Sequence, residues 1–427
     1  MHVLILGGDG YLGWPTAMYF SNRGYQVTVV DNYFRRNACT ELDVGMLYPV
    51  PTLQERAKIW HELTGHEIKV VIGDLSDPEV MRALFSGTVT YSWCIDKTFT
   101  GTPNTVIHYA EQPSAPYSLI NYKYANITVQ NNLLITNNLV WALRDFSRDT
   151  HVIHIGTMGE YGTPNIDIEE GWLEIEHKGR KDKFLFPRQA SSLYHTTKIM
   201  DTDLFWFAVR MWDLRVTDLM QGPVYGIETE ESEIGEKRLE EREKRKEKRN
   251  DSNFSSLSSN LSHLTSHISP LASIFNYDEI FGTIINRFIT QAVIGYPLTV
   301  YGKGGQTRGY LNINDTLQCV HKSEQTPAQK GELRIFNQIM ETFSVNQLAE
   351  MTQRVGKSLG YNVEIQNLEN PRKEAEEHYY NPAYHGLIDI GVEPHYLTDE
   401  VMERMFRVVE KYKNNIRKDV IFKGIKW

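Results

Sequence analysis

The sequence predicts an α/β protein built on a doubly wound parallel sheet, with a smaller mixed lobe that binds substrate. Three observations predict this fold class. Short apolar runs alternate with segments of helical spacing, which is the pattern of strand–helix–strand units. The first apolar run ends at a glycine-rich loop, and the second ends at Asp31. The chain has 427 residues, which is long enough for two or three domains.

Six apolar runs are predicted to form the strands of the sheet. They are short and rich in Val, Ile and Leu, as expected of parallel strands buried on both faces, and they lie at 2–6, 26–30, 68–72, 106–109, 152–155 and 214–219. Glycine or aspartate ends several of them, as Gly7 and Asp74 show. Helical spacing predicts helices between strands at 10–23, 117–148 and 189–211.

The pattern changes after Gln221 to mixed elements separated by turns that contain Gly and Pro. We therefore expect a dinucleotide-binding domain at 1–221 and mostly a substrate-binding lobe at 222–427. Within that lobe, 236–249 is charged at every position except Leu239, and 251–273 is rich in Ser and Asn. Such a composition buries too little apolar surface to fold by packing, so 236–270 is predicted to be a mobile insertion.

Apolar residues in the insertion recur at steps of three and four, which leaves a second interpretation open. This spacing is typical of an amphipathic helix that docks on a partner, and it involves Phe254, Leu257, Leu261, Leu264, Ile268 and Leu271.

Composition argues against several classes of protein. The net charge is −9, so a basic surface for nucleic acid is not expected. The three cysteines, Cys39, Cys94 and Cys319, form no C-x-x-C pair, and no other residues show metal-ligand spacing. No uncharged apolar stretch is long enough to span a membrane, and a strand beginning at residue 2 leaves no room for a targeting peptide. We therefore expect a cytoplasmic protein without metal, nucleic-acid partner or membrane insertion.

The pattern Gly7-x-x-Gly10-x-x-Gly13 lies directly between the first strand and the first helix. The first glycine permits a tight turn, the second lets the backbone approach a pyrophosphate, and the third permits close helix–strand packing. Asp31 follows 18 residues after Gly13, where an acid accepts hydrogen bonds from ribose hydroxyls and repels a 2′-phosphate. The arrangement favours NAD over NADP, although Arg35 and Arg36 are groups that could accept a 2′-phosphate.

Tyr194 and Lys198 share one face of a predicted helix, because they are four residues apart. We expect the ammonium to lower the pKa of the phenol from roughly 10 towards neutrality. Such a tyrosine can take a proton from a hydroxyl while hydride leaves the same carbon. Thr157 follows the fifth strand, where an active-site hydroxyl is expected.

With these motifs, the chain resembles the extended short-chain dehydrogenase/reductase family of nucleotide-sugar enzymes, and within it the UDP-sulfoquinovose synthases. Longer runs carry the closer resemblance, at 7–11, 111–118, 156–171, 301–310 and 370–381. The resemblance covers nearly the whole chain, apart from about 235–272 and 89–104.

The resemblance implies synthesis of UDP-sulfoquinovose from UDP-glucose and sulfite. In that family, NAD oxidises the sugar at carbon 4 and water is eliminated across carbons 5 and 6. Sulfite then adds at carbon 6, which forms the carbon–sulfur bond, and carbon 4 is reduced again. The product enters sulfolipid or glycan biosynthesis. The resemblance also implies a homodimer, for which the helix predicted at 117–148 could supply the interface.

The resemblance also implies three groups of site residues. The catalytic group is Thr157, Tyr194 and Lys198, with His195 as an acid or base near carbon 6. The nucleotide sugar is expected to contact Thr157, Gln221, Gln306, Arg308 and, through its diphosphate, Arg372. The NAD contacts are expected to be Gly7, Gly10, Tyr11, Leu12, Gly13, Asp31, Asn32, Arg35, Arg36, Asp74, Leu75, Gln112, Asn131, Tyr194, Lys198 and Val224.

Two departures from the family patterns bear on the activity. Related 4,6-dehydratases have Thr-Asp-Glu where this chain has Thr157-Met158-Gly159, so their acid and base are missing. Pro113 stands where plant members have arginine, so anion recognition would need another residue. Two alternatives remain: an NAD-dependent nucleotide-sugar epimerase or 4,6-dehydratase that does not use sulfite, and a catalytically silent NAD-sensing protein whose charged insertion binds a partner.

Overall fold

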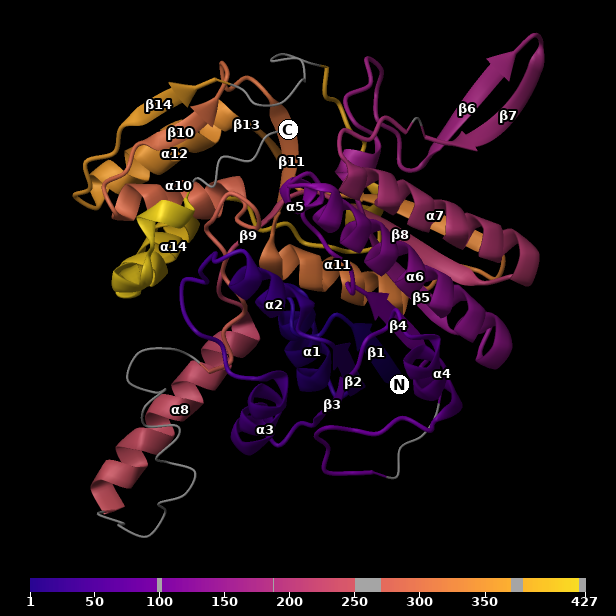
Figure 1. The fold of residues 1–427 in the computed structure, drawn as a ribbon, viewed down its shortest axis with the longest axis horizontal. Helices are drawn as coiled ribbons and strands as arrows, with labels where there is room; N and C mark the ends of the chain where they lie inside the picture. Colours follow the sequence, from indigo (N-terminus) through magenta and orange to yellow (C-terminus); the bar gives the residue numbers. More distant parts are fainter. Residues whose placement is uncertain (98–101, 187, 250–269, 370–378, 422–427) are drawn as a thin grey trace.

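The computed structural model describes residues 1–97, 102–186, 188–249, 270–369 and 379–421. Its centre is a seven-stranded sheet in the order β12-β8-β5-β4-β1-β2-β3 (Figure 1). All pairings in this sheet are parallel. The strands are β1 (His2–Leu6), β2 (Gln26–Asp31), β3 (Ile68–Ile72), β4 (Thr105–His108), β5 (His151–Thr157), β8 (Arg215–Gln221) and β12 (Glu332–Gln338).

The sheet contains the six predicted strands and one strand that the sequence analysis did not assign. This strand, β12, pairs with β8 along its whole length, from Glu332 opposite Arg215 to Gln338 opposite Gln221. The chain runs from β1 to β2 on one side and later returns to β4 on the other, so β1 marks the switch point of the topology. Ligands bind at such a point, outside the carboxyl ends of the strands.

Helices cover both faces of the sheet, which confirms the predicted doubly wound fold. Val3 and Ile5 of β1 pack against α1, α3 and α11, whereas Leu4 and Leu6 pack against α4, α6 and α7. Because both faces of β1 are buried, its sequence is continuously apolar. The helices on these faces are α1 (Gly13–Asn22), α3 (Leu53–Thr64), α4 (Pro78–Ser86), α6 (Tyr122–Phe146), α7 (Leu193–Trp212) and α11 (Ile313–Gln325).

The long helix predicted at 117–148 is two helices, α5 (Ala115–Ser118) and α6. Ser114 caps the first by accepting a hydrogen bond from the backbone of Tyr117 at 3.1 Å. Asn121 caps the second by accepting from the backbone of Lys123 at 2.9 Å. Each cap satisfies amide groups that have no partner inside the helix, so the chain starts a new helix after α5 instead of continuing it.

A second lobe has its own apolar core, built around Phe288, Leu348 and Phe406. Its sheets have the orders β13-β11-β9 and β10-β14. Its strands are β9 (Val224–Tyr225), β10 (Leu298–Tyr301), β11 (Thr307–Asn312), β13 (Glu341–Ser344) and β14 (Ile365–Leu368). Its main helices are α10 (Ile284–Val293), α12 (Val345–Ser358) and α14 (Asp399–Lys411). The remaining short elements of the whole chain are α2 (Phe34–Glu41) and η1 (Met158–Glu160) in its first half, and α13 (Gly386–Asp389), η2 (Lys413–Asn415) and η3 (Lys418–Val420) in its second half.

Two elements project from the body in Figure 1. One is the antiparallel hairpin of β6 (Trp172–His177) and β7 (Arg180–Leu185), whose base packs through Trp172 against Trp206 at 5.0 Å between ring centroids. The other is helix α8 (Glu230–Arg249). No helix in the described ranges has the length and apolar character needed to cross a membrane.

Helix α8 changes the interpretation of the charged insertion, because 236–249 is helical and not an irregular loop. Glu, Lys and Arg are good helix formers, and Lys237 lies 3.9 Å from Glu233 one turn away. The start of the helix is tied to the body by an ion pair of 2.8 Å between Arg23 and Glu231. Leu271, which follows the insertion, is fully buried. The remainder of the proposed docking pattern, at 254–268, lies outside the described residues.

Candidate active site

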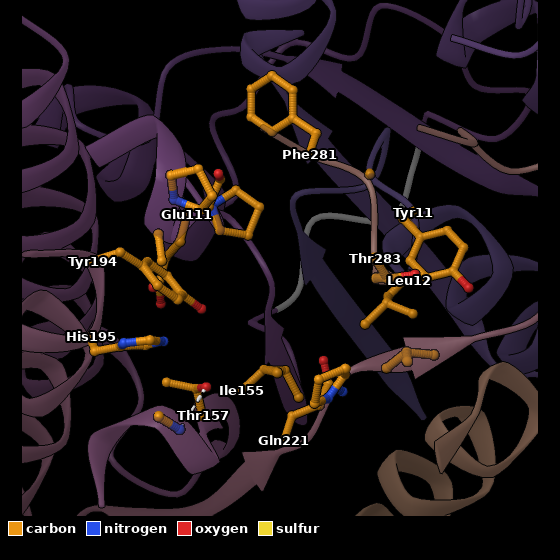
Figure 2. Close-up of a pocket in the computed structure, with 18 of the residues that line it drawn as sticks. Tyr11, Leu12, Glu111, Ile155, Thr157, Tyr194, His195, Gln221, Phe281 and Thr283 are labelled. Carbon is orange, nitrogen blue, oxygen red and sulfur yellow. Dashed lines mark hydrogen bonds between the residues drawn. The ribbon is translucent and has the colours of Figure 1, made fainter. Parts of the chain in front are cut away.

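A cavity of about 1140 Å³ opens at the carboxyl ends of β1, β2, β4, β5 and β8 and is bounded on its far side by the second lobe (Figure 2). The glycine loop after β1 forms one end, and residues of α7 and η1 form the other. The topology explains the position. The strand order reverses at β1, and such a switch point leaves a crevice outside the carboxyl ends of the strands.

The glycine loop has the shape that a dinucleotide phosphate requires. Gly7 has a φ of +89°, and a Cβ there would lie 2.8 Å from the backbone of Tyr109. A Cβ on Gly13 would lie 2.0 Å from the carbonyl oxygen of Gly7, so the helix could not pack so closely with any other residue. A Cβ on Gly10 would come no closer than 3.4 Å to a neighbouring atom, the Gly7 carbonyl oxygen, and this residue lines the cavity. The backbone at Gly10 is therefore open to a ligand.

Asp31 and Arg35 line the cavity beside this loop. The two oxygens of Asp31 accept hydrogen bonds from the backbone of Asp9 at 2.8 Å and of Tyr33 at 2.7 Å. Burial, and then the charge of Asp9, raise the pKa of Asp31 to about 6. The Arg35 guanidinium lies 4.1 Å from the centre of the Phe281 ring, and its Nη1 is buried without a hydrogen-bond partner among the described residues. Both groups fit the polar end of a nucleotide.

The remaining predicted NAD contacts divide into two sets. Tyr11, Leu12, Asn32, Leu75, Asn131, Tyr194 and Val224 line the cavity. Arg36, Asp74, Gln112 and Lys198 do not line it.

Arg36, Asp74 and Gln112 each form hydrogen bonds with other residues of the protein. Arg36 donates two hydrogen bonds to Asp9, at 2.6 and 2.7 Å, so its guanidinium holds the glycine loop. Asp74 is exposed and accepts a hydrogen bond from the hydroxyl of Ser76 at 2.7 Å. Gln112 is fully buried and donates to the Ser114 carbonyl at 3.0 Å.

Thr157, Tyr194 and His195 lie together at the other end of the cavity (Figure 2). The rings of Tyr194 and His195 are 5.2 Å apart between centroids. The His195 Nδ1 lies 3.1 Å from the hydroxyl of Ser192, the residue that caps α7. Thr157 accepts a hydrogen bond from the backbone of Gly159 at 3.1 Å. A phenol, an imidazole and a hydroxyl therefore meet where a ligand would extend beyond the coenzyme.

Lys198 is only 1% exposed, does not line the cavity and belongs to a buried polar network. Its Nζ donates to Glu111 Oε1 at 2.5 Å and lies 2.7 Å from His154 Nε2. Because an ammonium only donates, His154 Nε2 must be the acceptor in this contact. His154 Nδ1 then carries the proton and donates to Asp218 at 3.0 Å.

This network also corrects the predicted pKa of Tyr194. Burial raises the pKa of Tyr194 above its ordinary value. The Lys198 ammonium lowers it, but nearby carboxylates, of which Glu111 has the largest effect, raise it again. The phenol therefore keeps its proton in the ligand-free protein. The prediction considered the ammonium alone, and the carboxylate that balances it becomes visible only in the fold.

Glu111, His154 and Asp201 each bring one possible metal-ligand atom within 4.8 Å of the others. The Lys198 ammonium already lies among them, in contact with Glu111 and His154 and 3.9 Å from Asp201. The cluster is thus arranged around an ammonium supplied by the protein, and its charge suits that group better than a metal ion.

The predicted nucleotide-sugar residues Gln221, Gln306 and Arg308 also line the cavity. Gln221 donates to Gln338 at 2.9 Å. Gln306 is buried, and its Oε1 has no hydrogen-bond partner within the described part of the chain. Arg372 lies outside the described residues.

Several residues that line the cavity were missed, namely Glu111, Glu279, Arg287 and Tyr301. Glu279 accepts a hydrogen bond from Tyr301 at 2.9 Å, and Arg287 lies over the same ring at 6.0 Å. Glu279 and Arg287 belong to no motif of fixed spacing, so only the packing of the second lobe reveals them, whereas Tyr301 begins the run at 301–310 that carries the resemblance. Glu111 lies in the run at 111–118 that carries the resemblance, and this signal could have found it.

The fold and the cavity define an NAD-dependent enzyme of the extended short-chain dehydrogenase/reductase class. The chain belongs to the NAD dependent epimerase/dehydratase family, whose model matches residues 3–248, and within it to the family of the UDP-sulfoquinovose synthases.

Two relatives support the narrower assignment. The chain is 42% identical over 425 residues to "UDP-sulfoquinovose synthase, chloroplastic" of Spinacia oleracea, covering 100% of this chain and 79% of that protein. It is 37% identical over 430 residues to "UDP-sulfoquinovose synthase" of Sulfolobus acidocaldarius, covering 100% and 98%.

Solved structures resemble the chain in fold alone. A UDP-glucuronic acid 4-epimerase from Bacillus cereus, in complex with UDP-glucuronic acid and NAD, superposes with a TM-score of 0.64 at 16% identity, covering 96% of this chain and 99% of that one. A UDP-glucose 4-epimerase from Bifidobacterium longum, in complex with NAD+ and UDP, gives 0.64 at 16% identity, covering 99% and 100%.

Proposed function

We propose that the protein makes UDP-sulfoquinovose from UDP-glucose and sulfite, with NAD bound in the cavity. The observation that carries this proposal is the composition of the catalytic end. Tyr194 and His195 lie side by side there, and Gly159 stands where sugar dehydratases have an acid. The full-length similarity to two proteins named UDP-sulfoquinovose synthase supports the same conclusion.

The residues divide the proposed reaction among them. NAD held beside Gly10, Asp31 and Arg35 would supply the acceptor for hydride from carbon 4 of the sugar and the donor for its return. Tyr194 exchanges the proton of the hydroxyl on carbon 4, and Thr157 binds and orients this hydroxyl. His195 moves the protons for loss of water across carbons 5 and 6, and its Nδ1 faces the Ser192 hydroxyl at 3.1 Å. Sulfite replaces one hydroxyl and water leaves, so the overall reaction involves no net oxidation of the sugar.

One end of the cavity suits the coenzyme, and the other suits the nucleotide sugar. We assign the coenzyme to 1–221, with Gly10, Asp31 and Arg35 at its adenosine and phosphate end. The nucleotide sugar is assigned mostly to 222–427, where Gln306 and Arg308 line the cavity. Pro113 also lines the cavity, and proline cannot bind an anion through its side chain. We therefore assign the recognition of sulfite to another lining residue, His195.

The experiment that tests this function is incubation of the purified protein with UDP-glucose, with and without sulfite, followed by mass spectrometry. A sulfonated UDP-hexose that forms only with sulfite supports the proposal. A dehydrated or epimerised sugar formed without sulfite would favour the epimerase or dehydratase alternative. No turnover under either condition would favour a protein that only senses NAD.

The assembly proposed with this function is a homodimer formed through α6 and α7. These helices pack together and expose large apolar side chains, including Leu134 at 45%, Trp141 at 44% and Phe207 at 44%. Exposed apolar groups on two adjacent helices are typical of a subunit interface. Light scattering of the native protein should give twice the monomer mass, and Trp141→Glu should reduce it to the monomer mass. A wild-type monomer would contradict the assembly.

A further inference from the structure

The two ring nitrogens of His195 have different surroundings. Nδ1 lies 3.1 Å from the Ser192 hydroxyl and 3.3 Å from the Ser191 hydroxyl. Nε2 lies beside Gly159, where a Cβ would be only 2.3 Å away from it. Gly159 lines the cavity and has no side chain that could cover the ring. The hydroxyl contacts therefore hold His195 through Nδ1, and Nε2 is the nitrogen beside the cavity wall.

Ser192 is fixed in place by helix α7, which it caps. It is 8% exposed, and its Oγ accepts a hydrogen bond from the backbone nitrogen of His195 at 3.1 Å. Its carbonyl accepts from the backbone nitrogen and from the hydroxyl of Thr196, both at 3.0 Å. One buried oxygen thus contacts both the backbone and the ring of His195. Ser191 is exposed, so Ser192 is the better placed of the two hydroxyls to orient the ring.

The direction of the ring hydrogen bond follows from the proton transfer assigned to His195. The ring lies with Tyr194 and Thr157 at the catalytic end of the cavity (Figure 2). A neutral imidazole carries one hydrogen, so Nε2 can take a proton only if Nδ1 carries that hydrogen. A serine oxygen has two acceptor sites, so Ser192 Oγ can accept from Nδ1 as well as from the backbone. A hydroxyl stabilises an imidazolium less than a carboxylate does, so Nε2 can give the proton away again.

We propose that Ser192 is a positioning residue that accepts the Nδ1 hydrogen of His195, so that Nε2 carries the proton during loss of water from the sugar. The proposal rests on the proposed function. The bond between carbon 5 and its hydrogen breaks, the proton passes to Nε2, and the electron pair forms the double bond between carbons 5 and 6. The bond between carbon 6 and its hydroxyl oxygen breaks, and the hydroxyl takes the proton from Nε2 and leaves as water. His195 therefore ends the step in the tautomer in which it began.

Rapid mixing of the NAD-loaded protein with UDP-glucose and sulfite tests the proposal, because it separates removal of hydride from loss of water. The absorbance of NADH follows the first step, and the amount of sulfonated product follows the later ones. Ser192→Ala should form NADH at a rate within about twofold of wild type, since Tyr194 is untouched. Its product formation should fall about tenfold or more, so that NADH accumulates.

Thr398→Ala is the matched control for loss of a helix cap. Thr398 caps α14 by accepting a hydrogen bond from the backbone of Val401 at 3.3 Å, and it does not line the cavity. Both alanine variants should lower the melting temperature by a few degrees, but Thr398→Ala should keep wild-type turnover.

Two further variants separate the hydroxyl of Ser192 from its part in folding. Ser192→Gly removes the hydroxyl at a position where glycine is a tolerated cap, so it should repeat the loss of product at nearly wild-type stability. Ser192→Thr keeps a hydroxyl at the cap and should restore turnover to within about threefold of wild type.

Three results would overturn the proposal: wild-type product formation by Ser192→Ala and Ser192→Gly, equal losses of NADH and product, or the same loss of product in Thr398→Ala. A wild type that forms NADH and a dehydrated sugar but no sulfonated one would instead overturn the sulfite reaction. The dehydrated sugar would then replace the sulfonated product in the same comparison of variants. A wild type that forms no NADH from UDP-glucose would overturn the proposed oxidation at carbon 4, and the role of Ser192 with it.

Discussion

Gly159 and His195 are in such close contact that a Cβ on Gly159 would lie 2.3 Å from His195 Nε2. The imidazole therefore occupies the space that a larger residue at 159 would need. This contact gives a physical reason why the glutamate of the dehydratase pattern is absent at position 159. The chain can hold either a larger side chain at 159 or His195 in its present place. The departure from the dehydratase pattern thus places an imidazole next to Tyr194.

Gly159→Ala should displace His195 and lower turnover with UDP-glucose and sulfite by about 10- to 100-fold, because a general acid or base is moved out of reach. NAD binding should stay unchanged, since the glycine loop lies at the other end of the cavity. A double-mutant cycle provides the control: in a His195→Ala background, the alanine at 159 should cause little further loss. Equal losses in both backgrounds would contradict displacement of His195 as the cause.

Tyr194→Phe should keep NAD but lose turnover by about 100-fold or more, because it removes only the group that exchanges the substrate proton. Bound nucleotide released from the purified variant would measure the first effect, and steady-state kinetics the second. Tyr122→Phe, at a position 81% exposed, is the matched control and should behave as wild type. Undiminished activity of Tyr194→Phe would refute the assigned role.

The raised pKa of Tyr194 has a spectroscopic consequence. A raised pKa extends the neutral form of a phenol to higher pH, so the ligand-free protein should show no phenolate from Tyr194 between about pH 7 and about pH 9. Ultraviolet difference spectra of wild type minus Tyr194→Phe would isolate this residue. A phenolate signal that rises near neutral pH would mean that Lys198 dominates over burial and Glu111.

Asp9→Asn should destabilise the protein by roughly 3–5 kcal/mol, the cost typical of an uncompensated buried charge. Asp9 accepts hydrogen bonds from Arg56, which is fully buried, at 2.5 Å and from Arg36 at 2.6 Å. Urea denaturation would measure the loss. The control is Asp399→Asn, which breaks an exposed pair with Arg354 and should cost less than about 1 kcal/mol. Similar losses in both variants would contradict the burial argument.

Removal of 237–269 should leave folding and turnover intact. The two sides of the insertion already meet, because a Cβ on Gly235 would lie 2.4 Å from Leu271 Cδ1, so a short linker can join them. Leu271 must stay, since its carbonyl accepts a hydrogen bond from Trp14 at 3.0 Å. Thermal denaturation and turnover would be compared with wild type. Aggregation or lost activity would indicate that the insertion docks on the body or on a partner.

Much of the fold could be predicted because each strand carries its own signal. The runs at 2–6 and 68–72 are strands with the predicted bounds. By contrast, β12 was not assigned and was found only through its pairing with β8. The helix at 117–148 was predicted without its break, because the caps at Ser114 and Asn121 are short-range hydrogen bonds that apolar periodicity does not report.

The sequence by itself determined the parallel sheet and the glycine loop with Asp31, since local periodicity and fixed spacing specify these features. It predicted that Tyr194, His195 and Thr157 share one site only through the resemblance to a known family. Only the tertiary structure decided that Arg36 binds Asp9, that Lys198 is buried behind Glu111, and that His195 fills the space beside Gly159. The physical reason is that the direction and charge of a long polar side chain depend on its neighbours in space. Those neighbours come from strands and loops distant in the chain, and no local pattern encodes their distances.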